Sequence, residues 1–302
     1  MNRHPISLFL LFTLLFSSVF YFLIIRSGHM GGGWGGYVAG LMWSPGFAAL
    51  LTCRLLGRDL KTLGWSWGSG RYETIAYFIP LAYSAGIYGF VWLTGLGTFF
   101  NKEFVAKVTQ SFGLGPLPDW LSITLYFLFT ATFAVIRDTA TVIGEEIGWR
   151  GFLVPELAKD RGFTATAAIT GLIWAVWHYP VVLFADYKSD TPVWFYLPLL
   201  TIMLPFITFV WTWLRLKSGS IWPCVILHAS HNTFIQSFFD PLTVHNRKTN
   251  YVANEFGAGI LVLSILMAFY FWRRRGEVEG KSRVAESSQL VHSFERGLQD
   301  SL

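Results

Sequence analysis

Apolar residues run through this chain in long stretches that are separated by short polar or glycine-rich segments. Eight stretches approach the roughly 20 residues that a helix needs to cross the hydrocarbon core of a bilayer. They cover residues 6–25, 37–56, 74–99, 119–142, 163–185, 192–214, 219–239 and 255–272. This pattern predicts an all-α protein, a polytopic transmembrane helix bundle of about eight spans.

The first stretch needs a separate argument, because a secretory signal peptide is also apolar. Its run from Ile6 to Ile25 is longer than the roughly 7–15 residues of a signal peptide, which also ends at a small-residue cleavage site. Here the run ends at Arg26. We therefore interpret it as the first membrane span.

The composition agrees with a membrane protein. Only 14% of the 302 residues are charged and 53% are hydrophobic, whereas a soluble domain carries about 25% charged residues. The net charge of +5 could suggest a nucleic-acid partner, but no basic stripe with interleaved aromatic residues is present. We expect the lipid bilayer as the environment and no nucleic-acid partner.

The distribution of lysine and arginine predicts the orientation. If the N-terminus and the even-numbered connections are cytoplasmic, that side carries about twice as many of these residues as the other, as the positive-inside rule requires. Both termini are then cytoplasmic. We expect one transmembrane unit over residues 1–272, a polar and weakly ordered cytoplasmic tail over 273–302, and a location in a prokaryotic inner membrane.

A first group of charged residues stands out in the sequence GEEIGWRG, residues 144–151. A charge at bilayer depth costs at least about 2.5–3.5 kcal/mol, so it is a functional-site hypothesis by default. Glu146 and Arg150 are four residues apart, acid first, which favours an ion pair on a helix. Glu145 is rotated by about 100° from Glu146 and is left to face another partner. The alternative is that all three are solvated at the membrane surface.

Two further groups of polar residues interrupt apolar segments. His178 closes the sequence WAVWHYP, with Trp174 one turn earlier on the same helical face. His228 and Asn232, in HASHN, are also four residues apart and share one face. We interpret His231, which neighbours Asn232, as structural. We interpret Arg137 and Asp138, which precede the glutamate motif, in the same way. Taken alone, His178 or His228 could also be structural.

Together these residues could activate water. Glu145 can accept a proton and His178 can orient the water or share the proton. His228 and Asn232 can donate hydrogen bonds to a developing oxyanion. The expected reaction class is hydrolysis of an acyl bond, and we expect that bond to be a peptide bond. Glu145, His178 and His228 could instead bind zinc with an open position for water, and the spacing does not separate the two versions.

The three motifs resemble those of the CAAX prenyl protease and bacteriocin-processing family, also called CPBP or Abi. Its members carry EExxxR, FxxxH and HxxxN or HxxxD in this order. The corresponding residues here are Glu145-Glu146 with Arg150, Trp174 with His178, and His228 with Asn232. The resemblance covers about residues 119–240, and tryptophan replaces the usual phenylalanine at position 174.

The resemblance implies an intramembrane endopeptidase with a cavity inside the bilayer that is open toward the cytoplasmic side. Glu145 and His178 would activate water there, and His228 and Asn232 would stabilise the oxyanion. Glu146, Arg150 and Trp174 would support the site. The substrate would be a membrane-associated peptide or protein. For the family, a zinc mechanism and a metal-free glutamate mechanism are both argued.

Two other functions compete with this one. The first is a non-catalytic membrane protein, such as a bacteriocin self-immunity factor or a scaffold, that retains the polar core for helix packing. The second is a small transporter whose buried charges line a path. The absence of inverted repeats in the sequence makes the transporter the weaker alternative.

Overall fold

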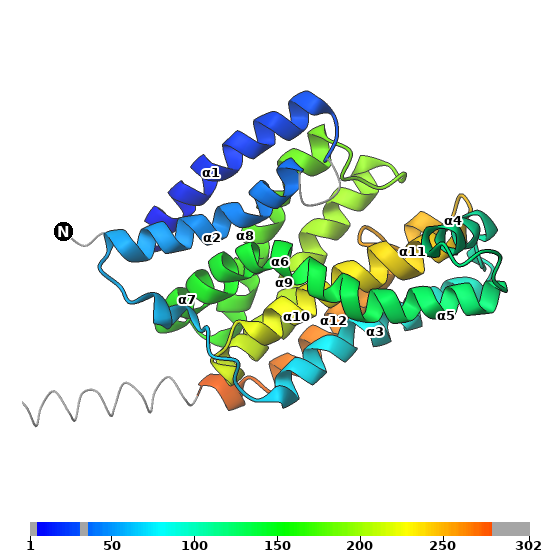
Figure 1. Ribbon diagram of the computed structural model, residues 1–302. Coiled ribbons are helices and arrows are strands. Elements are labelled where there is room, and N and C mark those ends of the chain that lie inside the picture. The colour runs from blue at the N-terminus through cyan, green and yellow to red at the C-terminus, as the bar shows by residue number, and fades with distance from the viewer. Residues whose placement is uncertain (1–4, 31–35, 280–302) are drawn as a thin grey trace, which may run out of the picture.

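The computed structural model describes residues 5–30 and 36–279. Its long helices are α1 (Pro5–Ser27), α2 (Tyr37–Leu55), α3 (Gly70–Leu93), α8 (Phe163–Phe184) and α9 (Val193–Ser218). They form a bundle with the shorter helices α10 (Trp222–Asn232) and α12 (Ala258–Arg273) and with one very long helix (Figure 1). The predicted polytopic helix bundle is confirmed.

The very long helix contains the glutamate motif. It runs without interruption from Asp119 to Asp160 over 42 residues. Its parts are α5 (Asp119–Phe129), α6 (Val135–Glu146) and α7 (Val154–Asp160), joined by π-helical turns at Thr130–Ala134 and Ile147–Leu153. The predicted span 119–142 is therefore only the first part of a helix that carries the whole motif into the bundle.

Six described helices, including this one, are long and apolar enough to cross a membrane. The two other predicted spans are also helical. Residues 255–272 correspond to α12, which has 16 residues. Residues 219–239 correspond to α10 and the π-helical turn Thr233–Phe239 that continues it, where the four polar residues of HASHN interrupt the apolar run.

The connections contain the remaining elements. They are the 3₁₀ turns Leu60–Leu63 and Thr249–Tyr251, the amphipathic helix α4 (Lys102–Phe112), the short α11 (Asp240–Leu242), and the strands β1 (Gly97–Phe99) and β2 (Thr243–His245). The strands pair antiparallel, with Gly97 opposite His245. This two-stranded sheet joins the α3–α4 connection to the segment that follows α11.

A close helix crossing fixes the glutamate motif in the bundle. At Gly144 of α6, a Cβ atom would lie 2.5 Å from the Cα of Trp43 on α2. At Gly148, it would lie 2.4 Å from the Cβ of Pro45. Small residues allow backbones in membrane bundles to approach in this way. The two glycines therefore bring α2 against the same turns that carry Glu145 and Glu146.

The chain after α12 is not a free tail at its start. Arg274 Nε donates to Glu277 Oε1 at 2.6 Å, and Lys217 Nζ at the end of α9 lies 2.8 Å from Glu277 Oε2. Hydrogen bonds from Arg274 and Lys217 hold the pKa of Glu277 well below its usual range, at about 2. The first residues of the predicted tail thus contact the end of α9, while 280–302 lie outside the described residues.

Candidate active site

The ion pair expected from the spacing of the glutamate motif is present. Arg150 Nη1 donates to Glu146 Oε1 at 2.8 Å, and both side chains are fully buried. The alternative, in which these charged side chains are solvated at the membrane surface, is therefore wrong for Glu146 and Arg150. Arg150 lies in the π-helical turn Ile147–Leu153, and such turns occur frequently at functional sites.

Two indole rings lie close to the buried guanidinium. The Cζ atom of Arg150 lies 4.3 Å from the ring centre of Trp174 and 5.2 Å from that of Trp211. An aromatic face attracts a cation, more strongly where water is excluded. Helices α8 and α9 thus each supply one tryptophan to a charge carried by the long helix.

Glu146 has a second partner that the sequence did not indicate. The Nδ1 atom of His228 on α10 lies 2.8 Å from Glu146 Oε1, the same oxygen that binds Arg150. Glu146 is therefore more than a local clamp, because it connects the long helix to the histidine of the third motif.

Glu145 points in a different direction, as its rotation on the helix predicts. It lines a cavity, and Trp174 Nε1 donates to its Oε2 atom at 2.7 Å. His178 lines the same cavity, and its Nδ1 atom lies 2.8 Å from the carbonyl oxygen of Trp174. A carbonyl can only accept, so Nδ1 carries the proton and Nε2 of the neutral ring is an acceptor.

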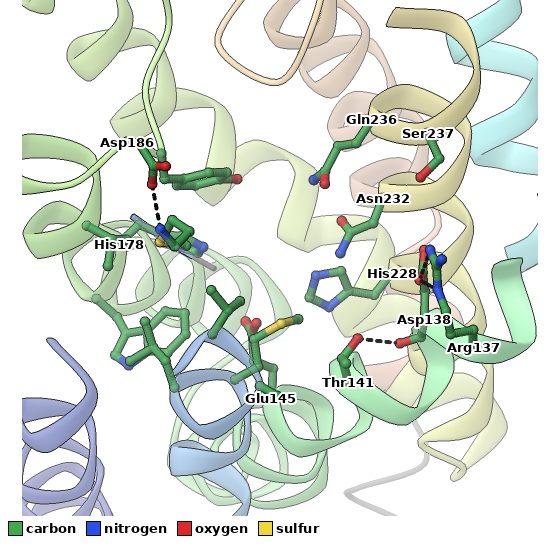
Figure 2. Close-up of a pocket in the computed structure, with 18 residues that line it drawn as sticks. Arg137, Asp138, Thr141, Glu145, His178, Asp186, His228, Asn232, Gln236 and Ser237 are labelled. Carbon is green, nitrogen blue, oxygen red and sulfur yellow. Dashed lines mark hydrogen bonds and ion pairs between the residues drawn. The ribbon is translucent and has the colours of Figure 1, made fainter. Parts of the chain in front are cut away.

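All four residues expected to be catalytic line this one cavity, which has a volume of about 560 Å³. Figure 2 shows Glu145, His178, His228 and Asn232 around it, from three different helices. Glu146, Arg150 and Trp174 lie behind this lining, which suits a supporting position. The structure thus brings the motif residues together, while their chemical roles remain predictions.

The cavity lies toward one end of the bundle. Met30 in the α1–α2 connection and Asp186 and Tyr187 in the α8–α9 connection line it, and the backbone N–H of Met30 donates to Asp186 Oδ1 at 2.7 Å. On the other side of Glu145, the helix crossing at Gly144 and the fully buried Arg150 fill the bundle. The start of α1 and the end of α12 lie at that closed end (Figure 1).

This position affects two expectations at once. Cytoplasmic termini and a cavity open to the cytoplasm are both correct only if the termini and the cavity lie at the same end of the bundle. They lie at opposite ends, so at most one of the two expectations is correct.

We expect a single cysteine at Lys159 and one at Lys188 to react with an impermeant maleimide from opposite sides of the membrane. Both positions are exposed, and the native Cys53 and Cys224 are buried. Labelling from one side only would contradict the helix arrangement, and the side that Lys188 reports identifies the correct expectation.

The donor side chains around the cavity do not have the geometry of a zinc site. Within residues 5–30 and 36–279, no three histidine, cysteine, aspartate or glutamate side chains converge closely enough to hold a metal ion. Glu145, His178 and His228 share the cavity but do not form a ligand set. We therefore derive no step through zinc.

A further buried carboxylate, Glu255, was not predicted from the sequence. Tyr187 donates from its hydroxyl to Glu255 Oε2 at 2.6 Å, Gln236 donates to Oε1, and His231 Nε2 lies 3.4 Å from Oε1. His231 also contacts the Tyr83 hydroxyl, which supports its structural interpretation. Glu255 is a charged residue at the start of the predicted span 255–272, and this signal could have identified it.

Arg137 and Asp138, which we interpreted as structural, form a local ion pair. Arg137 Nη2 lies 2.8 Å from Asp138 Oδ1, and Thr233 donates to Asp138 Oδ2 at 2.7 Å. Both residues line the cavity, which the structural interpretation did not include. Their pair therefore forms part of the wall on the side of α6.

A helix bundle that encloses a polar cavity is typical of intramembrane proteins with a buried site. Comparison with known proteins indicates which family of such proteins this chain resembles. Residues 120–234 match the family model of type II CAAX prenyl endopeptidases, Rce1-like. CAAX prenyl protease 2 of Methanococcus maripaludis is 26% identical over 141 residues, which are 44% of this chain and 48% of that relative. The family resemblance carried by the three motifs is thereby confirmed. The match spans about half the length of the relative.

Proposed function

We propose that this protein is an intramembrane endopeptidase that hydrolyses a peptide bond in a membrane-associated peptide or protein. One observation carries the proposal: the polar side chains of three motifs, on three helices, surround a single cavity inside an apolar bundle. The family match, which implies a peptidase, supports it.

The reaction begins with a water molecule between Glu145 and His178. Glu145 Oε2 accepts from Trp174, whereas Oε1 has no hydrogen-bond partner among the described residues. Oε1 takes a proton from the water as its oxygen attacks the peptide carbonyl, and His178 Nε2 accepts a hydrogen bond from the same water. The proton held by Glu145 then passes to the leaving amine as the C–N bond breaks.

The oxyanion formed in this step needs donors on the opposite wall. The amide NH₂ group of Asn232 donates without any change of protonation. His228 uses Nδ1 toward Glu146, so its Nε2 carries a proton only when the ring is an imidazolium. Asn232 is therefore the unconditional oxyanion donor and His228 the conditional one.

Purified protein in lipid vesicles tests the proposal with membrane-anchored reporter peptides and mass spectrometry of the products. Because the relative is named a prenyl protease, one set of reporters carries a prenyl group at a cysteine and a matched set does not. Cleavage of either set supports endopeptidase activity, and a preference for the first supports a prenylated substrate. No cleavage of any reporter, with immunity retained in a double Glu145→Gln and His228→Ala variant, would favour the non-catalytic alternative.

A chelator series on the same preparation addresses the metal. We expect turnover to persist after incubation with a zinc chelator and dialysis, because the donor side chains do not converge on one point. Turnover that disappears and returns with added zinc would contradict this expectation. It would mean that substrate binding assembles a ligand set from Glu145, His178 and His228.

A further inference from the structure

Trp174, the aromatic residue of the second motif, contacts three of the candidate catalytic side chains. Its indole N–H donates to Glu145, and its backbone carbonyl accepts from His178. Its ring lies against Arg150 and, with ring centres 5.4 Å apart, edge-on to His228. The side chain itself is buried. One residue therefore contacts a member of each motif.

The contact with Glu145 determines which carboxylate oxygen is available. The bond from Trp174 Nε1 to Oε2 is 2.7 Å long, which is short for an N–H donor and typical of a charged acceptor. Oε2 is thereby occupied, and Oε1 is left for water. Without this donor the carboxylate could rotate about its terminal torsion, which is broad for glutamate.

The contact with His178 comes from the same residue. Because the Trp174 carbonyl accepts the Nδ1 proton, the lone pair of His178 is on Nε2. Glu145 and His178 are 33 positions apart in the sequence, on different helices, yet both are oriented by Trp174. Phenylalanine, the usual family residue, would keep the ring and the carbonyl but has no N–H.

We propose that Trp174 is a positioning residue whose indole N–H aligns the carboxylate of Glu145 with the ring of His178, so that both address one water molecule. This inference rests on the proposed endopeptidase function. It assigns to the tryptophan a hydrogen-bond donor role that a packing or wall role does not include.

The test compares the same change at two tryptophans that lie close to the same arginine. Trp174→Phe removes the donor to Glu145. Trp211→Phe removes a buried N–H that has no hydrogen-bond partner in the described structure, on the second ring that lies close to Arg150. A displacement of about 1 Å can cost roughly 100-fold in rate, so we expect kcat to fall about 10- to 100-fold in Trp174→Phe with little change in KM. Trp211→Phe should keep most of kcat.

A second variant removes only the N–H. Benzothienylalanine at position 174 keeps the shape of the indole and replaces its nitrogen by sulfur. We expect the same loss of kcat as in Trp174→Phe. Wild-type kcat in this variant would overturn the proposal even if Trp174→Phe fails to fold, because the donor alone has been removed.

A spectroscopic measurement separates failure of this inference from failure of the proposed function. The indole N–H proton resonance of Trp174, assigned by its loss in Trp174→Phe, should shift upfield in Glu145→Ala. No shift would overturn the inference whether or not the protein cleaves any peptide. A shift without cleavage of any reporter would leave the contact established and overturn the endopeptidase function on which the inference rests.

Discussion

Replacing Glu145 by glutamine is expected to lower the turnover of a membrane-anchored reporter by about 100- to 10,000-fold, the usual contribution of a general base. The amide has the size of the carboxylate, and its oxygen can still accept the hydrogen bond from Trp174. It cannot take a proton from water. We therefore expect the melting temperature to be nearly unchanged while kcat collapses, as measured by product formation and thermal unfolding of the same preparation.

The matched control is Glu103→Gln, the same chemical change at an exposed residue of α4. This variant should cleave the reporter at the parent rate. Parent-level turnover in Glu145→Gln would exclude Glu145 as the base. Loss of turnover together with loss of folded protein would instead show that the carboxylate is needed for the helix packing around it.

Contacts within one helix turn could be predicted from the sequence. Spacing alone gave the Glu146–Arg150 pair and the shared face of His228 and Asn232, because a helix places residues four apart side by side. The same geometry separated Glu145 from Glu146. The motifs then supplied the expectation that these faces meet, and the cavity contains all four expected catalytic side chains.

Contacts between helices could not be predicted in this way. The bonds from His228 to Glu146 and from Trp174 to Glu145 depend on how α8 and α10 are rotated against the long helix. That rotation is set by packing, such as the glycine contacts with α2, and no spacing rule contains it. The role of Glu146 was therefore assigned too narrowly.

The end of the bundle at which the cavity lies could not be predicted from the sequence, for a related reason. Hydropathy predicts which segments cross the membrane, and the lysine and arginine bias predicts their direction. Neither indicates where along a helix the bundle is filled. Here the close crossing at Gly144 and the stacked Arg150 fill one end, so the position of the cavity follows from packing.

The largest expected effect on stability comes from Arg150→Met. Removing one partner of a buried ion pair costs about 3–5 kcal/mol, because the remaining charge is left in a medium of low polarity. Glu146 is fully buried, and its Oε2 atom already lacks a partner among the described residues. In this variant only His228 would still contact the carboxylate. We expect the unfolding transition in detergent to shift by a corresponding amount.

Two comparisons make this prediction specific. Arg137→Met removes the same charge from a pair whose arginine side chain is 52% exposed, so it should cost only about 0–1 kcal/mol. The double variant Arg150→Met with Glu146→Gln also removes the stranded charge, and it should be more stable than Arg150→Met alone. Such non-additivity is expected of two residues in direct contact. The free-energy changes of Arg150→Met and Glu146→Gln could instead add up to that of the double variant. The buried carboxylate of Glu146 would then have to be neutral in the parent protein. Arg150 would be held by the indole rings of Trp174 and Trp211 rather than by Glu146.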